Sequence, residues 1–124
     1  MQNKSKKVVA VLSDLMFMVK IQEAAKRAGL DPVFVKTRQE ALEQAKNHPV
    51  AVIIDLNNPT AEPLDIIEQC KANSETNKVN LIAYVSHVQA DLKQAAQEKG
   101  ADLVMARSAF SQNLPNILKR YAGA

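Results

Sequence analysis

The sequence has few of the residues on which many kinds of functional site depend. Its 124 residues include three glycines, one cysteine and no tryptophan. The glycines, Gly29, Gly100 and Gly123, are too far apart to form a phosphate-cradling loop, which excludes dinucleotide and P-loop nucleotide binding. The single Cys70 excludes an internal disulfide and every zinc pattern built from several cysteines, and it suits a reducing compartment.

Long hydrophobic runs are also absent. The first apolar run, residues 8–12, is too short for the hydrophobic region of a signal peptide or for a membrane span. Apolar residues nevertheless make up 47% of the chain, enough for a contiguous core. We therefore expect a single domain over residues 1–124, located in the cytoplasm and without a membrane partner.

Charge of one sign is not concentrated anywhere in the chain. Sixteen Lys and Arg residues are interleaved with thirteen acids, for a net charge of +3. Nucleic-acid-binding domains usually cluster their positive charge and add aromatic residues or a known motif. Only three Phe and two Tyr are present, with no such motif, which argues against a nucleic-acid partner.

Five short apolar runs alternate with segments of helical spacing. The runs cover residues 8–12, 32–36, 50–55, 80–85 and 102–106. Each is apolar nearly throughout, which is typical of strands buried on both faces of a parallel sheet. The strand–helix order, repeated five times, predicts an α/β fold with a doubly wound, five-stranded parallel sheet of the flavodoxin-like kind.

The predicted helices cover residues 17–28, 37–45, 64–70, 86–99 and 113–121. Thr37 with Glu40, and Ser86 with Gln89, have the spacing of a capping box at a helix start. Pro115 is expected in the first turn of the last helix, where a proline is tolerated.

Ligands and chemistry gather beyond the carboxyl ends of the strands in such sheets. The polar residues there are Ser13, Asp14, Asp55, Asn57, Ser86, His87, Arg107 and Ser108. Asp14 and Asp55 leave neighbouring strands, so they are candidates to share a Mg²⁺ ion, with Asn57 as a third ligand through its backbone carbonyl. His87 is interpreted as a loop residue at the rim.

These residue types together fit a phosphoryl site. Asp55 would be the nucleophile and phosphoacceptor, Arg107 would neutralise an anion there, and Ser86 would donate a hydrogen bond. Simpler roles stay open, because Asp14 also suits a helix N-cap and Ser86 also suits its capping box. Arg107 needs an anionic partner, and we expect Asp55 before Asp14.

The pattern resembles the receiver domain of bacterial response regulators, the CheY-like family, over nearly the whole chain. Residues 55–59 (Asp-Leu-Asn-Asn-Pro) look like the phosphoacceptor aspartate with its proline four residues on. Residues 81–86 look like the strand that ends in the family's Ser or Thr, and residues 100–108 like the stretch that normally ends in Lys-Pro. Asp14 falls on the acidic residue that contacts magnesium in the family.

The resemblance implies a stand-alone receiver-like module of phosphorelay, or two-component, signal transduction, and not an enzyme. Its partners would be a sensor kinase or phosphotransfer protein and a downstream target, contacted through the last helices and the fifth strand. The chain itself would be a monomer or a weak homodimer. Less favoured alternatives are a small-ligand-binding flavodoxin-like domain and a nucleic-acid adaptor.

Four departures from the family pattern fall in one site. Ser13 replaces one member of the acidic pair, which should weaken Mg²⁺ binding. Arg107 stands where the family has lysine, and Ser108 where it has the following proline. Val104 stands where the family has its switching aromatic residue. We therefore expect a degenerate pocket, or pseudo-receiver, and the alternative function is an adaptor that needs no phosphorylation.

Two surface features add to this interpretation. Lys93, Lys99, Lys119 and Arg120 are expected to form a basic face for an acidic partner. Residues 15–19 are apolar all round the first helical turn, although one face is enough to meet the sheet. Within them, Met16 is expected either to act as a lid over the pocket or form a docking patch, or to be covered by loops.

Overall fold

The computed structural model describes residues 6–86 and 89–123, and its centre is one sheet of five parallel strands in the order β2-β1-β3-β4-β5. The strands are β1 (Lys7–Val11), β2 (Asp31–Val35), β3 (Ala51–Asp55), β4 (Leu81–Val85) and β5 (Leu103–Ala106). This confirms the predicted doubly wound parallel sheet, with each strand within one residue of its expected bounds.

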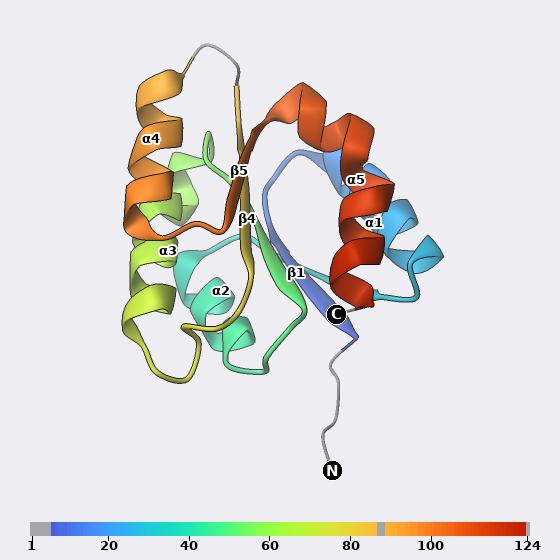
Figure 1. Ribbon diagram of the computed structural model, residues 1–124, viewed down its shortest axis with the longest axis horizontal. Coiled ribbons are helices and arrows are strands. Elements are labelled where there is room, and N and C mark those ends of the chain that lie inside the picture. The colour runs from blue at the N-terminus through green and yellow to red at the C-terminus, as the bar shows by residue number, and fades with distance from the viewer. Residues whose placement is uncertain (1–5, 87–88, 124) are drawn as a thin grey trace.

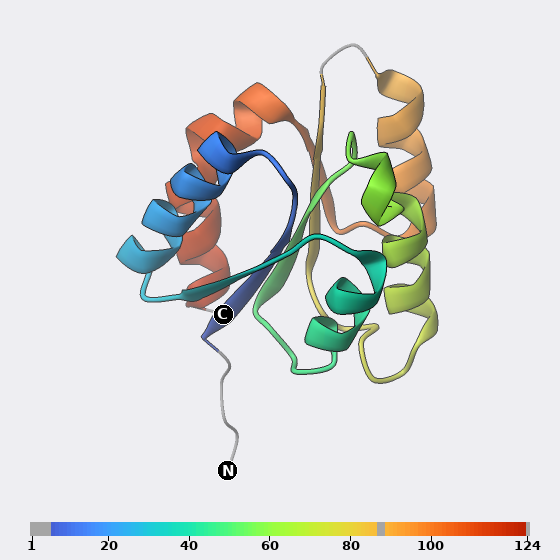
Figure 2. The ribbon, with the colours of Figure 1, turned by 180° about the vertical axis from the view of Figure 1, so that it is seen from behind.

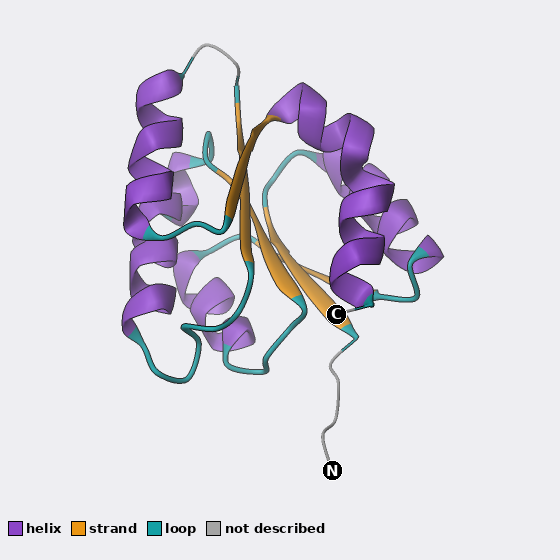
Figure 3. Ribbon diagram, in the orientation of Figure 1, coloured by secondary structure: helices purple, strands orange, loops and turns teal. Residues whose placement is uncertain are grey.

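Helices cover both faces of the sheet (Figures 1 and 2). They are α1 (Leu15–Arg27), α2 (Arg38–Ala45), α3 (Pro63–Ala72), α4 (Ala90–Lys99) and α5 (Arg107–Ala122), with a short 3-10 turn η1 (Pro59–Ala61). α1 and α5 lie together on one face and α2, α3 and α4 on the other, as Figure 3 shows by element type. In the described part of the chain, no helix combines the length and apolar character needed to cross a membrane.

The strands are apolar throughout because each face of the sheet has its own core. In β1, Val9 and Val11 belong to the cluster under α2, α3 and α4, while Val8 and Ala10 belong to the cluster under α1 and α5. Successive strand residues point to opposite faces, so a strand covered on both sides needs an apolar residue at every position.

The two predicted capping boxes have different outcomes. At α2 the prediction is confirmed, since Thr37 Oγ1 accepts from the N–H of Glu40 at 3.1 Å and Glu40 Oε1 accepts from the N–H of Thr37 at 3.3 Å. At α4 it is wrong. Gln89 is the N-cap residue, no side chain caps the helix, and Ser86 lies three residues before it. The side chain of Gln89 is used instead in a contact between loops, described below.

The start of α5 was also predicted wrongly. The helix begins at Arg107, directly after β5, so Pro115 lies in its interior and not in its first turn. Phe110 and Leu114 are buried and extend the apolar stripe of the helix towards its N-terminus. Burial of this stripe offsets the cost of one backbone hydrogen bond lost at the exposed proline.

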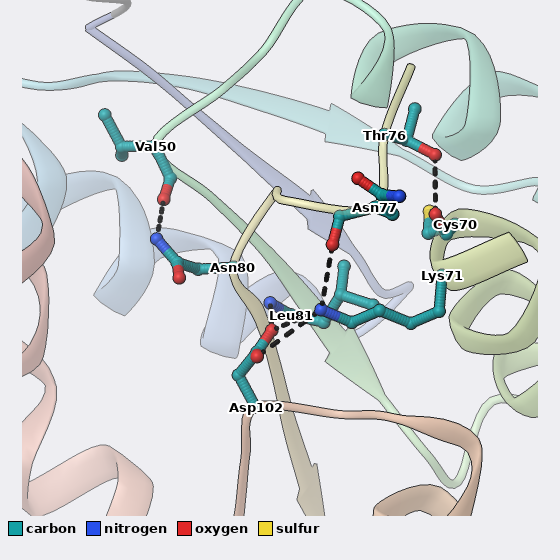
Figure 4. A network of polar contacts seen from close by, with 8 residues as sticks. All are labelled: Val50, Cys70, Lys71, Thr76, Asn77, Asn80, Leu81 and Asp102. Atoms are coloured by element: carbon teal, nitrogen blue, oxygen red, sulfur yellow. Dashed lines mark hydrogen bonds and ion pairs between the residues drawn. The ribbon is translucent and has the colours of Figure 1, made fainter. Parts of the chain in front are cut away.

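Structural hydrogen bonds occupy the amino edge of the sheet (Figure 4). Asp102 accepts from the backbone N–H of Leu81 at 2.8 Å and from Lys71 Nζ at 3.1 Å, and Asn80 Nδ2 donates to the carbonyl of Val50 at 3.0 Å. These contacts join the starts of three strands to α3. The polar residues predicted to form the functional site lie at the opposite, carboxyl edge of the sheet.

Candidate functional site

Asp14 anchors the site to the start of α1. Its Oδ1 accepts hydrogen bonds from the backbone N–H groups of Met16 at 3.0 Å and Phe17 at 3.1 Å, which confirms the N-cap role. Its Oδ2 accepts from Arg107 Nη2 at 2.5 Å. This hydrogen bond, followed by that of Phe17, lowers the pKa of Asp14 below its ordinary value.

The partner of Arg107 differs from the preferred expectation, which was Asp55. The guanidinium lies over the ring of Phe17, 4.6 Å from the ring centroid, and this cation–π contact holds it beside the start of α1. Asp14 is therefore the acid within reach, and within the described residues no ion pair joins Arg107 to Asp55. Two strand ends that are distant in the sequence are joined by this pair.

Asp55 ends β3 and is half-buried. Its Oδ1 accepts from the backbone N–H of Asn57 at 2.9 Å. Burial raises the pKa of Asp55, and the Asn57 hydrogen bond and the positive charge of Arg107 oppose the rise. Asp55 is thus a carboxylate held at the carboxyl edge, with no salt bridge among the described residues to favour its charged form.

Asn57 joins the loop after β3 to the loop after β4. Its Oδ1 accepts from the backbone N–H of Ser86 at 2.9 Å, and its Nδ2 donates to Gln89 Oε1 at the start of α4. Asn57 and Ser86 are site residues predicted from the sequence, whereas Gln89 was missed because its spacing from Ser86 predicted a capping box. His87, the predicted rim residue, lies outside the described residues.

An aromatic cluster lies beneath the site. Tyr84 on β4 stacks on Phe110 of α5 with ring centroids 5.1 Å apart, and it contacts Phe17 of α1 at 4.9 Å. Tyr84 is 1% exposed, and its hydroxyl has no hydrogen-bond partner among the described residues. Burial, followed by the negative charge of Asp55, raises the pKa of Tyr84 far above its usual range, so the phenol stays neutral.

Of the two carboxylates predicted to share a Mg²⁺ ion, Asp55 alone keeps an oxygen without a hydrogen-bond partner among the described residues. A magnesium site usually takes one or two carboxylates with oxygens open to the metal. Both oxygens of Asp14 already accept hydrogen bonds, from two backbone N–H groups and from a cation, and one oxygen of Asp55 accepts from Asn57. No cluster of three or more His, Cys, Asp or Glu suited to a metal occurs in residues 6–86 and 89–123. The positive charge beside Asp14 is supplied by Arg107.

The other departures from the receiver pattern have clear positions. Ser13 is exposed between β1 and the N-cap Asp14. Ser108 is the second residue of α5, so the position of the family's proline lies within a helix and not in a loop. Val104 is buried against the α2–α4 side of the sheet, on the face opposite the aromatic cluster. β5 therefore has no aromatic side chain that could change position in response to Ser86.

The four cations predicted to form one basic face lie on two helices that flank the edge strand β5. α4 and α5 lie on opposite faces of the sheet, with β5 between them (Figure 1). Lys99 is also engaged, because its Nζ binds Glu68 Oε1 at 2.9 Å. Lys93 on α4 and Lys119 and Arg120 on α5 are exposed, but they do not share a helix layer.

Similar solved structures include response regulators and the receiver domain of a sensor kinase. The chain is similar to a putative response regulator from Chloroflexus aurantiacus J-10-fl, with a TM-score of 0.83 and 21% identity over 98% of this chain and 100% of that one. A response regulator from Hahella chejuensis gives a TM-score of 0.82 and 18% identity over 94% of this chain and 95% of that one. A third similar structure is the receiver domain of a sensor histidine kinase from Pseudomonas aeruginosa PAO1, which has a magnesium ion in its active site cleft. Its TM-score is 0.81 and its identity is 16%, over 97% of this chain and 99% of that one. No family model and no curated protein sequence matches the chain.

Replacing Asp55 by asparagine is expected to raise the midpoint of thermal unfolding by a few degrees at pH 7.5. The asparagine side chain keeps an oxygen for the N–H of Asn57 and removes the cost of burying a charge. Because the folded state raises the pKa of Asp55, the penalty exists only where the carboxyl is ionised. The difference from the parent protein should therefore shrink as the pH falls through the raised pKa of the folded state and be absent below the ordinary value of 3.8.

The matched control is Asp31→Asn, a substitution of an exposed acid. Scanning calorimetry should show no change in its unfolding midpoint, at pH 7.5 or below pH 3.8. A less stable Asp55→Asn protein at pH 7.5 would contradict the burial argument.

Proposed function

We propose that this chain, which has the fold of response-regulator receiver domains, is a cytoplasmic signalling module of the two-component type that acts through protein contacts without being phosphorylated. The observation that carries the proposal is the Arg107–Asp14 ion pair at 2.5 Å. It closes the site between β1 and β5 and holds one conformation. The partners would be a sensor kinase or phosphotransfer protein and a downstream target, as for the receiver domains that the chain resembles.

Arg107 acts in this proposal as a built-in cation. Its hydrogen bond to Asp14 raises the pKa of the guanidinium above an already high value, so the charge is present at every physiological pH. The charge is also fixed in place by the ring of Phe17. A metal ion would have to displace this cation from Asp14, and no step of the proposed function uses one.

Asn57 gives the module its second fixed contact. By binding the backbone of Ser86 and the side chain of Gln89, it holds the loops after β3 and β4 in one relative position. Asn57, Ser86 and Gln89 are then already joined to one another before a partner arrives. A preformed surface binds with a smaller loss of conformational entropy than a mobile one.

A second candidate function, a receiver that is phosphorylated on Asp55, has one observation in its favour. Asp55 lies at the carboxyl end of β3, and in the described part of the chain its Oδ2 has no hydrogen-bond partner. This oxygen would attack the phosphorus of a donor, and the bond from phosphorus to the leaving group would break. Asp14 would then be needed to hold Mg²⁺ beside Asp55, and its pairing with Arg107 keeps it from the ion.

Intact mass spectrometry after incubation with Mg²⁺ and acetyl phosphate distinguishes the two functions. We expect no phosphoryl adduct on the parent protein beyond that on Asp55→Ala. Arg107→Ala, which releases Asp14, should gain an adduct that Asp55→Ala/Arg107→Ala lacks.

A stoichiometric adduct on the parent that is absent from Asp55→Ala would overturn the proposal and establish the phosphorylated receiver. Lys93→Ala, a cation on the far face of the sheet, controls for a general effect of lost charge and should behave as the parent does.

A further inference from the structure

A cavity of about 810 Å³ lies at the carboxyl edge of the sheet, between the N-terminal parts of α1 and α5. Neither Asp55 nor Asn57 lines it, so it is distinct from the candidate phosphoryl site, although Asp14, Ser86 and Arg107 form their common wall. Its volume falls within the range of small-molecule sites, about 300–1,000 Å³. Met16, one of whose expected roles was to cover the pocket or form a docking patch, lines this cavity.

One side of the cavity is apolar and uncovered. Met16 and Val19 line it with 83% and 55% of their surfaces exposed, next to Leu15, which is 72% exposed. The alternative that loops cover Met16 is therefore wrong. Exposed apolar side chains gathered in a concave region mark binding surfaces more often than ordinary surface does.

The other side of the cavity carries a single uncompensated positive charge. Asp14 and Arg107 neutralise each other. Lys20 Nζ donates to the neutral Ser111 Oγ at 2.7 Å, and no carboxylate of the described residues lies within ion-pair distance of it. Ser108, three residues before Ser111 on the same face of α5, adds a second hydroxyl to this side. The cavity thus combines one ammonium, two hydroxyls and an apolar wall.

We propose that this cavity binds a small amphipathic anion, with one acidic group on Lys20 and the hydroxyls of Ser108 and Ser111 and an apolar body against Met16 and Val19. The charge of the site matches one negative group, and the apolar wall matches a hydrocarbon body. A second copy of the chain fits less well, because a two-fold interface on this surface would bring two copies of Lys20 towards each other. The inference goes beyond the proposed function and does not depend on the chemistry of Asp55.

Titration with sodium octanoate, followed by amide chemical shifts in two-dimensional NMR, tests the proposal. We expect saturable shifts confined to the N-terminal parts of α1 and α5. Lys20→Met, which keeps the apolar stem of the side chain, should weaken binding about tenfold, as expected for loss of a charge-assisted hydrogen bond. Lys93→Met, on the opposite face of the sheet, should bind as the parent does.

Octylammonium supplies the matched ligand, with a similar hydrocarbon body and the opposite charge. Equal shifts with octylammonium, unchanged affinity in Lys20→Met, or shifts scattered over the whole surface would overturn the proposal. Sedimentation equilibrium tests the rival occupant: a parent dimer that Leu15→Ser converts to a monomer would make the cavity an interface between copies and would also overturn it.

Discussion

A protein carrying Phe110→Ala is expected to lose about 3–5 kcal/mol of unfolding free energy, the usual cost of removing a buried aromatic side chain. Phe110 is fully buried and stacks on Tyr84, and its ring centroid lies 6.0 Å from that of Phe17. The side chain therefore joins α5 to β4 and to α1. Because the total stability of a domain is about 5–15 kcal/mol, this one change leaves a marginal fold.

Urea denaturation monitored by far-UV circular dichroism measures the loss. The matched control is Phe34→Ala, the same truncation at a partly buried ring on the edge strand β2, for which a clearly smaller loss is expected. Equal losses at the two positions would show that the cluster around Tyr84 has no special place in the core. A secondary effect is also expected in Phe110→Ala, since α5 carries Arg107 at its first position and loosening the helix releases the ion pair.

Asp14→Ala is expected to destabilise the fold by about 2 kcal/mol near neutral pH. Loss of the N-cap costs about 0.5–2 kcal/mol, and loss of a partly exposed ion pair adds at most about 1 kcal/mol. The folded state lowers the pKa of Asp14, so its contribution is present above the ordinary value of 3.8. It is lost as the pH falls through the lower pKa of the folded state.

Urea unfolding at pH 7 and at pH 2.5 tests both the size and the sign of this prediction. The difference between the parent and Asp14→Ala should be large at pH 7 and reduced at the acidic pH. Asp91→Ala, an exposed acid in the first turn of α4 that caps nothing, should cost only a few tenths of a kcal/mol. A pH-independent effect of Asp14→Ala would mean that the charge of this residue has no part in its role.

The five strands could be predicted because burial on both faces leaves a direct mark on the sequence. Each of the five runs is apolar at nearly every position. The starts of the helices were harder to predict from the sequence. α5 begins at Arg107-Ser108, two polar residues with no capping side chain before them, and Pro115 suggested a later start.

The positions of the site residues could be predicted, but not their partners. Parallel strands bring their carboxyl ends to one edge, so Asp14, Asp55 and Arg107 had to lie near one another. Which acid Arg107 binds depends on the ring of Phe17, a tertiary contact that leaves no mark in sequence spacing. The role of Lys20 was missed for a related reason, because the early start of α5 is what places Ser111 beside it.

No residue separates the last strand from the last helix, since β5 ends at Ala106 and α5 begins at Arg107. The backbone at Arg107 is thus fixed by a strand on one side and a helix on the other, and a change of partner there must come from rotation of the side chain alone. Rotamer exchange of an exposed side chain takes picoseconds to nanoseconds, whereas loop rearrangement extends to microseconds. Arg107, held by Asp14 and by the ring of Phe17, can therefore leave its partner without any movement of the backbone.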